Sequence, residues 1–208
     1  MFRTFTATLV LAALAAAATV TGELTFDRGQ LTLKPMGGMT VVALGRCVGA
    51  WEVGAPAVPI AVAQLVVPPG MKVMGVKVDA VESETLSDRF DVYPVQPPRV
   101  ISDPRAPAYV PPDPKYYGAL YPGEVATAGH QGSMFGYNIA SAFVAPVLYD
   151  GTSKVLVFQR RVRFTLELAP ADLGYLRPGS RSPEARRRIE AQIASIVLNP
   201  EDVAACAP

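Results

Sequence analysis

The sequence predicts an all-β fold, an antiparallel β-sandwich, with one α-helix near the C-terminus. Short apolar or alternating segments recur along the chain with turn residues between them, which is the pattern of a sandwich. Residues 182–197 instead repeat apolar side chains at helical spacing. Residues 94–122 hold a large share of the 20 prolines, and proline removes the donors that a central strand needs. We expect this segment to form a long ordered loop over the surface.

The first 22 residues are predicted to form a signal peptide. Arg3 supplies a positive charge, and the apolar stretch from Leu9 to Ala18, about ten residues long, is too short to span a bilayer. Small residues follow at the spacing that signal peptidase needs, so we expect cleavage between Ala18 and Glu23. The protein would then be exported to the periplasm, the cell surface or the medium, with no membrane span left. The alternative is an uncleaved membrane anchor.

The mature chain is predicted to comprise a sandwich domain over residues 23–170, followed by a linker and terminal helix over residues 171–208. The predicted mature chain, residues 23–208, is long enough to form one sizeable hydrophobic core. The chain has 19 basic and 18 acidic residues and a formal charge of +1. That balance argues against nucleic acid as a partner, because neutralising phosphates requires a clustered basic excess.

In the first half of the domain, Leu24–Phe26 and Leu31–Leu33 alternate around Asp27–Gly29 and predict a hairpin. Met39–Leu44 is predicted to be a further short strand. The run Ile60–Val67 is apolar enough to be a strand buried on both faces.

A turn and two irregularities are also predicted. Pro69 and Gly70 fit the centre of a type II turn, where glycine adopts positive φ. The valines that follow slip once in their alternation, which predicts a β-bulge near Gly75. A similar slip occurs near Arg160.

The second half continues the strand pattern. Phe135–Val147 forms a long apolar run, and Asp150-Gly151 predicts a tight hairpin turn because these residues tolerate positive φ. Lys154–Leu168 completes that hairpin. Ser182 and Pro183 are suited to cap and start the terminal helix, which we expect to stop at Asn199-Pro200.

Residues with catalytic or ligand-binding chemistry are few, and we predict no catalytic residue, metal site or cofactor. His130 is the one histidine, and nothing around Cys47 or Cys206 resembles the nucleophile loop of a cysteine peptidase. One histidine and two distant cysteines also argue against a zinc site. The two cysteines either form a disulfide, as export allows, or stay free, with Cys47 as a small buried apolar side chain.

Two charged clusters have alternative interpretations. Glu82 and Glu84 share a strand face and either bind calcium or form a solvated face; the lack of further oxygen ligands favours the second. Arg186–Arg188 is either the polar side of the terminal helix or a processing site. Arg177 and Arg181 are better processing candidates, because they lie outside the predicted helix and a protease needs an extended substrate.

Several motifs, taken in order, resemble the propeptide domain of gingipain-type cysteine peptidases over about residues 24–170. They are GAPAVP (54–59), LVVPPGMKV (65–73), YPVQPPRV (93–100), YYGALYPGEV (116–125), GHQG (129–132) and APVLYDGTSKVLVFQRRVRFTLEL (145–168). The first two and the last are the more specific, and their shared order makes the resemblance stronger than any one of them.

The resemblance implies a β-sandwich pro-domain that assists the folding of a caspase-like cysteine peptidase domain, inhibits the zymogen and is removed by proteolysis. The implied partner is that catalytic domain, in cis or in trans. In the best-known members a basic residue of a pro-domain loop occupies the specificity pocket, which makes Arg99, Arg105 and Lys115 the inhibitory-loop candidates. Such a catalytic domain would follow the terminal helix, and this sequence ends at Pro208. The chain is therefore expected to be either part of a longer precursor or a pro-domain that stands alone.

A free-standing extracytoplasmic module that binds glycan or a surface protein is the alternative function, since sandwich folds serve both purposes. Under that alternative, Trp51, Tyr109, Tyr116 and Tyr117 would stack on sugars. We favour the interpretation in which they anchor the proline-rich loop.

Overall fold

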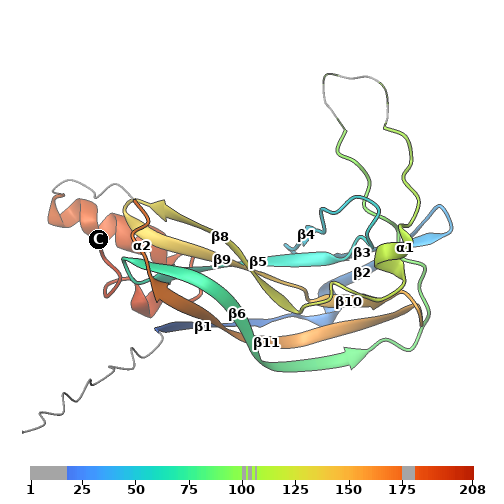
Figure 1. The fold of residues 1–208 in the computed structure, drawn as a ribbon, viewed down its shortest axis with the longest axis horizontal. Helices are drawn as coiled ribbons and strands as arrows, with labels where there is room; N and C mark the ends of the chain where they lie inside the picture. Colours follow the sequence, from blue (N-terminus) through green and yellow to red (C-terminus); the bar gives the residue numbers. More distant parts are fainter. Residues whose placement is uncertain (1–17, 100–101, 103–104, 106, 175–180) are drawn as a thin grey trace, which may run out of the picture.

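The computed structural model describes residues 18–99, 102, 105, 107–174 and 181–208. Two antiparallel β-sheets pack face to face, and the C-terminal helix lies against the outer face of one of them (Figure 1). This architecture confirms the predicted β-sandwich with a helix near the C-terminus.

The first sheet is built around one long strand. Its strands are β11 (Val155–Pro170) at the centre, β1 (Thr19–Thr25) and β10 (Val147–Asp150) along one edge, β6 (Met71–Thr85) along the other, and β7 (Leu120–Tyr121) beyond β10. Side chains alternate along β11, so its apolar face is buried and its charged face is exposed. The register between β6 and β11 shifts next to Gly75 and again at Arg160, which confirms both predicted slips.

The second sheet covers the apolar face of the first. Its strands, in spatial order, are β4 (Val48–Gly49), β5 (Pro59–Val67), β9 (Tyr137–Val144) and β8 (Ala126–Met134). Leu65 and Val144 from this sheet pack with Val162 and Phe164 from the other in one fully buried cluster. The prediction that β5 is buried on both faces holds at Pro59 and Ile60 and again at Leu65–Val67, but not between them, where Val62 is 47% exposed.

A small hairpin, β2 (Leu31–Met36) and β3 (Met39–Leu44), lies beside the sandwich. The predicted hairpin between Leu24–Phe26 and Leu31–Leu33 is wrong. Asp27 instead accepts a hydrogen bond from Gly29 and caps a 3₁₀ turn, η1 (Arg28–Gln30), which redirects the chain. β1 pairs with β11, and β2 pairs with β3 through Gly37 and Gly38, whose positive φ values of 58° and 81° suit a two-residue hairpin turn.

The two predicted turns have different outcomes. Gly70 has φ of 73°, and the Met71 N–H donates to the Pro68 carbonyl at 3.3 Å, as a type II turn requires. This turn leads the chain from β5 in one sheet to β6 in the other. The hairpin predicted at Asp150-Gly151 is confirmed, because β10 pairs with β11 from Asp150 and Val155 onward. Its loop is longer than the tight Asp-Gly turn expected, and the positive φ falls on Lys154. A Cβ on Gly151 would lie 2.1 Å from the Tyr117 carbonyl oxygen, so glycine is needed there for a close approach.

The C-terminal unit consists of α2 (Pro183–Ala194) and η2 (Pro200–Asp202). The Ser182 hydroxyl accepts from the Ala185 N–H at 3.2 Å, which confirms the predicted cap. Ile193, Val197, Val203 and Cys206 pack on Val66 and Tyr137 at the outer face of β5 and β9. The helix ends at Ala194, so the predicted stop at Asn199-Pro200 is wrong. Arg186–Arg188 lie exposed on the polar side of α2.

The first strand begins upstream of the position at which the mature domain was predicted to start. β1 begins at Thr19, four residues ahead of the domain start predicted at Glu23. Val20 is 7% exposed, and Gly22 faces the ring of Phe164. Among the described residues, no helix has the length and apolar character required to span a membrane.

Candidate functional site

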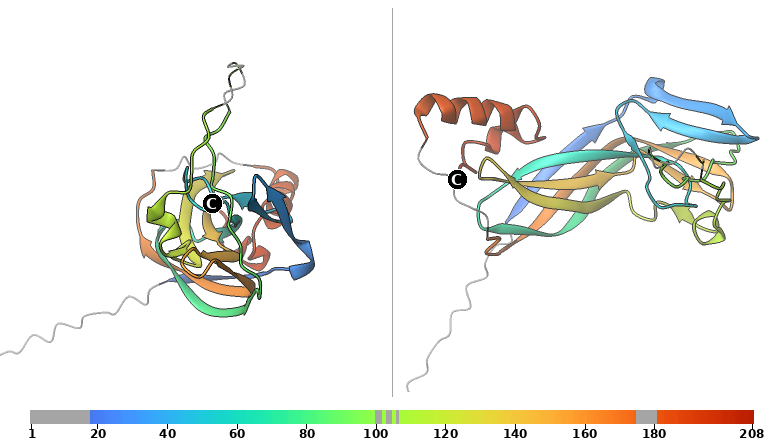
Figure 2. Two further views of the ribbon diagram at one scale, coloured as in Figure 1. Left: turned by 90° about the vertical axis from the view of Figure 1, so that its right-hand side faces the viewer. Right: turned by 90° about the horizontal axis from the view of Figure 1, so that it is seen from above.

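The proline-rich segment forms an arm, which we define as residues 95–113. Its two described legs, 95–99 and 107–113, extend from the end of the sandwich opposite α2 (Figures 1 and 2). The arm therefore stands off the sandwich and does not lie over its surface as the sequence analysis predicts. The reason is that the legs bond to each other and to a narrow base.

One side-chain amide joins the two legs. The Val110 N–H donates to Gln96 Oε1 at 2.9 Å, and Gln96 Nε2 donates to the Val110 carbonyl at 2.9 Å. The same nitrogen also donates to the Pro94 carbonyl at 3.0 Å. Prolines have no backbone N–H to form a ladder between the legs. The Gln96 amide supplies the missing donor and acceptor.

The GAPAVP motif forms the base of the arm. The Gly54 N–H donates to the Val95 carbonyl at 2.9 Å, and the Gly54 carbonyl accepts from the Asp113 N–H at 3.0 Å. One residue thus holds both legs. Its φ is 86°, and an added Cβ would lie 3.3 Å from Asp113 Cβ, so this position requires glycine. The Val95 N–H bonds in turn to the Ala55 carbonyl at 2.8 Å.

Tyrosines fix the chain on either side of the arm. The short helix α1 (Pro114–Tyr117) follows the second leg. Its Tyr117 hydroxyl donates to the Val92 carbonyl at 2.6 Å, and its ring meets that of Tyr149 with centroids 5.7 Å apart. Burial raises the pKa of Tyr117 well above its ordinary value. Tyr109 packs against Tyr93 at 6.0 Å. These contacts confirm the prediction that tyrosines anchor the proline-rich segment.

The structure separates the three inhibitory-loop candidates. Arg99 and Arg105 are exposed and lie on the arm. Lys115 lies in α1 at its base, with its ammonium 4.9 Å from the centre of the Tyr116 ring. Asp113 caps this helix by accepting from the Lys115 N–H at 2.9 Å. Lys115 therefore lies in a helical turn and not in the long loop that was expected over residues 94–122.

The two processing candidates lie between the sandwich and α2. Arg177 is outside the described residues. Arg181 directly precedes the Ser182 cap of α2, and its Nη1 donates to the Phe135 carbonyl at 2.9 Å. Phe135 lies in the β8–β9 turn with φ of 52°. Arg181 thus ties the start of the C-terminal unit to that turn.

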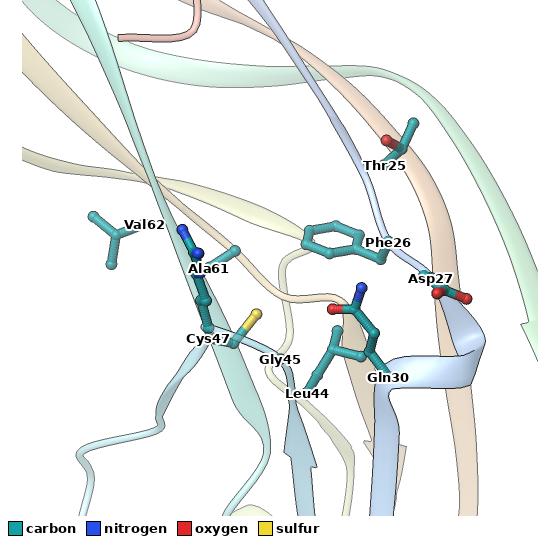
Figure 3. A pocket seen from close by; sticks show the side chains of 10 residues that line it. Thr25, Phe26, Asp27, Gln30, Leu44, Gly45, Cys47, Ala61 and Val62 are labelled. Atoms are coloured by element: carbon teal, nitrogen blue, oxygen red, sulfur yellow. The ribbon is translucent and has the colours of Figure 1, made fainter. Parts of the chain in front are cut away.

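The two cysteines and the histidine lie in separate places. Both cysteines are free, and burial raises the pKa of each thiol, which is opposite to what a reactive nucleophile needs. Cys47 lines a pocket of about 580 Å³ with Phe26 and Gln30 (Figure 3). His130 lies on β8, exposed, with its ring 6.4 Å from that of Phe143. Among the described residues, no group of three His, Cys, Asp or Glu is placed to hold a metal.

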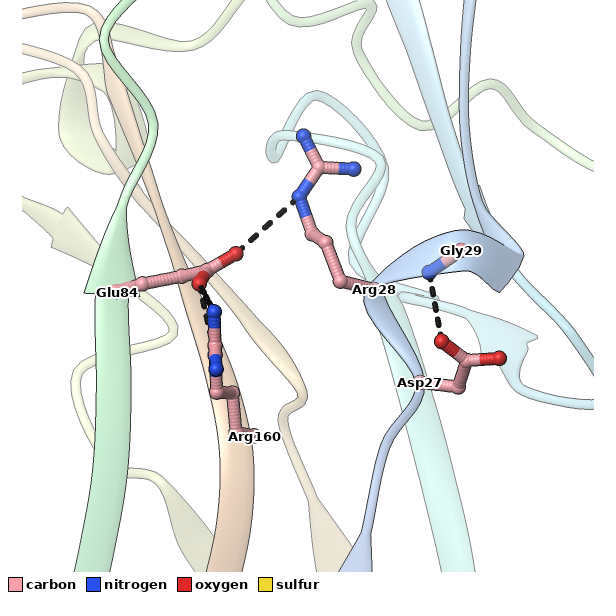
Figure 4. Close-up of polar contacts among 5 residues, drawn as sticks. All are labelled: Asp27, Arg28, Gly29, Glu84 and Arg160. Carbon is pink, nitrogen blue, oxygen red and sulfur yellow. Dashed lines mark hydrogen bonds and ion pairs between the residues drawn. The ribbon is translucent and has the colours of Figure 1, made fainter.

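Glu82 and Glu84 are engaged in ion pairs on the exposed face of the first sheet. Glu82 pairs with Arg161 at 3.1 Å. Glu84 pairs with Arg28 at 3.4 Å and also binds the guanidinium of Arg160 (Figure 4). This arrangement is the solvated strand face that the sequence analysis favours over calcium binding.

An anchoring role is favoured for Trp51 in the sequence analysis, but its ring pairs with Phe143 of β9 and not with an aromatic ring of the described proline-rich segment. It stands edge-on to Phe143 on the outer face of the second sheet, with centroids 4.9 Å apart, and is 53% exposed. Trp51 is therefore available for contact with another molecule.

Solved structures share this fold, among them the following two. One is the complex of the RgpB pro- and mature domains from Porphyromonas gingivalis, at 23% identity and a TM-score of 0.64, covering 90% of this chain and 95% of that one. The other concerns the zymogenic latency of gingipain K from Porphyromonas gingivalis, at 20% identity and a TM-score of 0.57, covering 76% of this chain and 96% of that one. The comparison with curated proteins found no match.

The family comparison is more direct. The model of the Propeptide_C25 family matches residues 16–174, which include both sheets and the arm with its base. The motifs of the sequence analysis fall within this range, and the structure gives GAPAVP a physical role as the support of the arm. The chain therefore belongs to the Propeptide_C25 family, which confirms its resemblance to gingipain propeptides.

Proposed function

We propose that this chain is an exported pro-domain that inhibits a gingipain-like cysteine peptidase, assists its folding and is removed by proteolysis. Family membership and the shared fold with the RgpB and gingipain K structures support the general assignment. The partner is the catalytic domain of such a peptidase, in cis or in trans. The chain itself supplies no catalytic residue in this proposal.

The arm is the observation that supports inhibition most directly. A protease cleft accepts extended backbone, and a segment ordered before binding loses less entropy in the complex. Proline stiffens the legs, while Gln96 and Gly54 hold them together at the base. The sandwich thus presents two legs that are already ordered before a partner binds.

Arg99 and Arg105 are the favoured inhibitory residues. Both lie exposed on the arm, where a basic side chain can enter a specificity pocket with a carboxylate at its base. Lys115 ranks below them because it lies in α1 and stacks on Tyr116. The alternative is that all three are solvated loop charges.

Processing is proposed at Arg177 or Arg181, upstream of α2. A cut after Arg181 requires its guanidinium to leave the Phe135 carbonyl, because a protease must bind the arginine side chain. The buried contacts of Ile193 and Val197 would then keep α2 on the sandwich after the cut. Cleavage and release would be separate steps.

One observation supports the alternative function, a free-standing binding module. Tyr109, Tyr116 and Tyr117 are used for anchoring, but Trp51 remains exposed. A sugar-binding platform would have to rest on that one ring and its neighbours. The inhibitory role is supported by the arm, by its base and by the family match.

Two assays on a gingipain-type catalytic domain test the proposal. The chain is added to the active enzyme, and separately to the denatured enzyme during refolding. We expect lower activity in the first assay and a higher yield of folded enzyme in the second. A variant with residues 97–109 replaced by a short glycine–serine linker is the control: it should lose inhibition and keep the folding effect. A wild-type chain that changes neither quantity would contradict the proposal.

A further inference from the structure

A second pocket, of about 300 Å³, opens beside the base of the arm. We call it the Trp51 pocket. It lies between the segment after β4, the segment from β7 to β8, and the outer face of β9. The residues that define it are Trp51, Glu52, Tyr121, Glu124, Thr127 and Phe143.

Aromatic rings form its walls. Trp51 stands edge-on to Phe143 at 4.9 Å, so the indole is fixed in position although 53% of the residue is exposed. Tyr121 is held from the other side by Tyr116, with ring centroids 5.5 Å apart. A fixed and exposed indole offers its π-face to a cation, and tryptophan is the best side chain for that contact.

The charges of the pocket have one sign. Among the described residues that line it, Glu52 and Glu124 are carboxylates and none is basic. The Tyr121 hydroxyl donates to Glu52 Oε2 at 2.6 Å and fixes that carboxylate. Burial, and then this bond, raise the pKa of Tyr121 well above its ordinary value, so it remains a donor. Within the described part of the chain, neither glutamate forms an ion pair, which leaves both charges uncompensated.

We propose that the Trp51 pocket binds an arginine side chain presented by a partner protein. A guanidinium stacks flat on an indole and donates paired hydrogen bonds to a carboxylate, and the pocket offers both contacts. Its volume suits a single side chain and is at the lower limit for a small-molecule ligand. A lysine ammonium can use the charges but not the stacking geometry, so arginine is the favoured occupant.

This site is independent of the inhibitory role of the arm. It receives a basic residue, whereas the arm presents basic residues to an enzyme. It can therefore be tested without a peptidase.

The intrinsic fluorescence of the chain provides the readout, because Trp51 is its one tryptophan. The probe is N-acetyl-arginine methylamide, and the comparator is N-acetyl-citrulline methylamide, which has nearly the same shape and no charge. We expect a saturable change in emission with the arginine probe and an apparent affinity for the citrulline probe at least about fivefold weaker. Equal responses to the two probes, or no saturation up to about 50 mM of the arginine probe, would contradict the proposal.

Two substitutions test whether the carboxylates of Glu52 and Glu124 bind the arginine probe. Glu52→Gln removes the charge but keeps an acceptor for Tyr121, and Glu124→Gln alters an exposed carboxylate that forms no hydrogen bond or ion pair within the described part of the chain. Each should weaken the arginine probe about fivefold, while Glu201→Gln, an exposed carboxylate on η2, should have no effect. Unchanged binding in Glu124→Gln and in a folded Glu52→Gln would overturn the assignment. So would saturable emission changes with an oligosaccharide and none with the arginine probe.

Discussion

The carboxamide of Gln96 pairs with the backbone of Val110 in both directions, donating at 2.9 Å and accepting at 2.9 Å. This side chain takes the place of a neighbouring strand between two proline-rich legs. Asn199 forms the same type of bridge with Val66, again at 2.9 Å in both directions. Two carboxamides therefore pair with backbone groups on a side of the chain where no strand is hydrogen-bonded; β5 has β9 on its other side.

Gln96→Ala should loosen the arm without unfolding the sandwich. The substitution leaves the Val110 N–H and carbonyl without their partner, so the legs lose their mutual connection. We expect faster amide exchange at Val110 and weaker inhibition of a gingipain-type peptidase, with a small change in the urea midpoint. Gln192→Ala, on the exposed side of α2, is the control. Equal exchange rates at Val110 in wild type and Gln96→Ala would show that the amide does not hold the legs.

Gly54→Ala should destabilise the base of the arm. Alanine at φ of 86° is strained, and its Cβ would lie 3.3 Å from Asp113 Cβ. We expect a loss of about 1 kcal/mol or more in the free energy of unfolding, with weaker inhibition. Gly70→Ala is the matched variant, because it has φ of 73° and open space around the new Cβ. It should cost about 1 kcal/mol and leave inhibition intact. Equal loss of inhibition in both variants would mean that Gly54 acts only through global stability.

Asn199→Ala should detach the C-terminal unit. The side chain is 2% exposed and satisfies the Val66 N–H and carbonyl at the edge of β5. Its removal leaves two buried polar groups unpaired, and we expect a loss of about 2 kcal/mol or more in urea unfolding. Leu198→Ala keeps the backbone bond from Leu198 to Gln64 and should cost less. A larger effect at Leu198 than at Asn199 would contradict this role for the amide bridge.

The exported protein should begin at Thr19. β1 starts there, so a cut directly before Thr19 leaves the whole strand in place. A cut after Gly22 would remove Val20 from the core and shorten the strand by more than half. Intact-mass measurement on secreted protein should show the loss of 18 residues, the number that precede Thr19. Retention of Met1, or a start at Glu23, would contradict this expectation.

Local patterns in the sequence predicted much of the fold. The strand predicted over Lys154–Leu168 is present as β11, because the alternation of its side chains is a local property of the sequence. The slips at Gly75 and Arg160 were visible for the same reason. Ser182 and Pro183 marked the start of α2 through local hydrogen bonding.

These local patterns could not predict which strands pair or which residues distant in the sequence come into contact. The partner of β1 depends on the free edge of β11, which lies far away in the sequence. The pair Gly37-Gly38 was an available hairpin signal, and it identifies the partner of β2 correctly. Gly151 lies in the predicted hairpin turn, but the requirement for glycine there comes from contact with Tyr117 and not from a positive φ. For the candidate site, the tyrosine anchors were predicted, but the bonds of Gln96 and Gly54 and the exposure of Trp51 depend on tertiary contacts.

The central claim is that the arm inserts a basic residue into the cleft of a gingipain-type cysteine peptidase. The direct measurement is the inhibition constant of the wild-type chain and of Arg99→Ala, Arg105→Ala and Lys115→Ala, with Arg187→Ala on exposed α2 as control. We predict that Arg99→Ala or Arg105→Ala weakens inhibition at least tenfold, about 1.4 kcal/mol, while Lys115→Ala and the control change it little. If none of the three candidate variants reaches a tenfold loss, the arm does not act through these side chains and the inhibitory contact lies elsewhere on the sandwich.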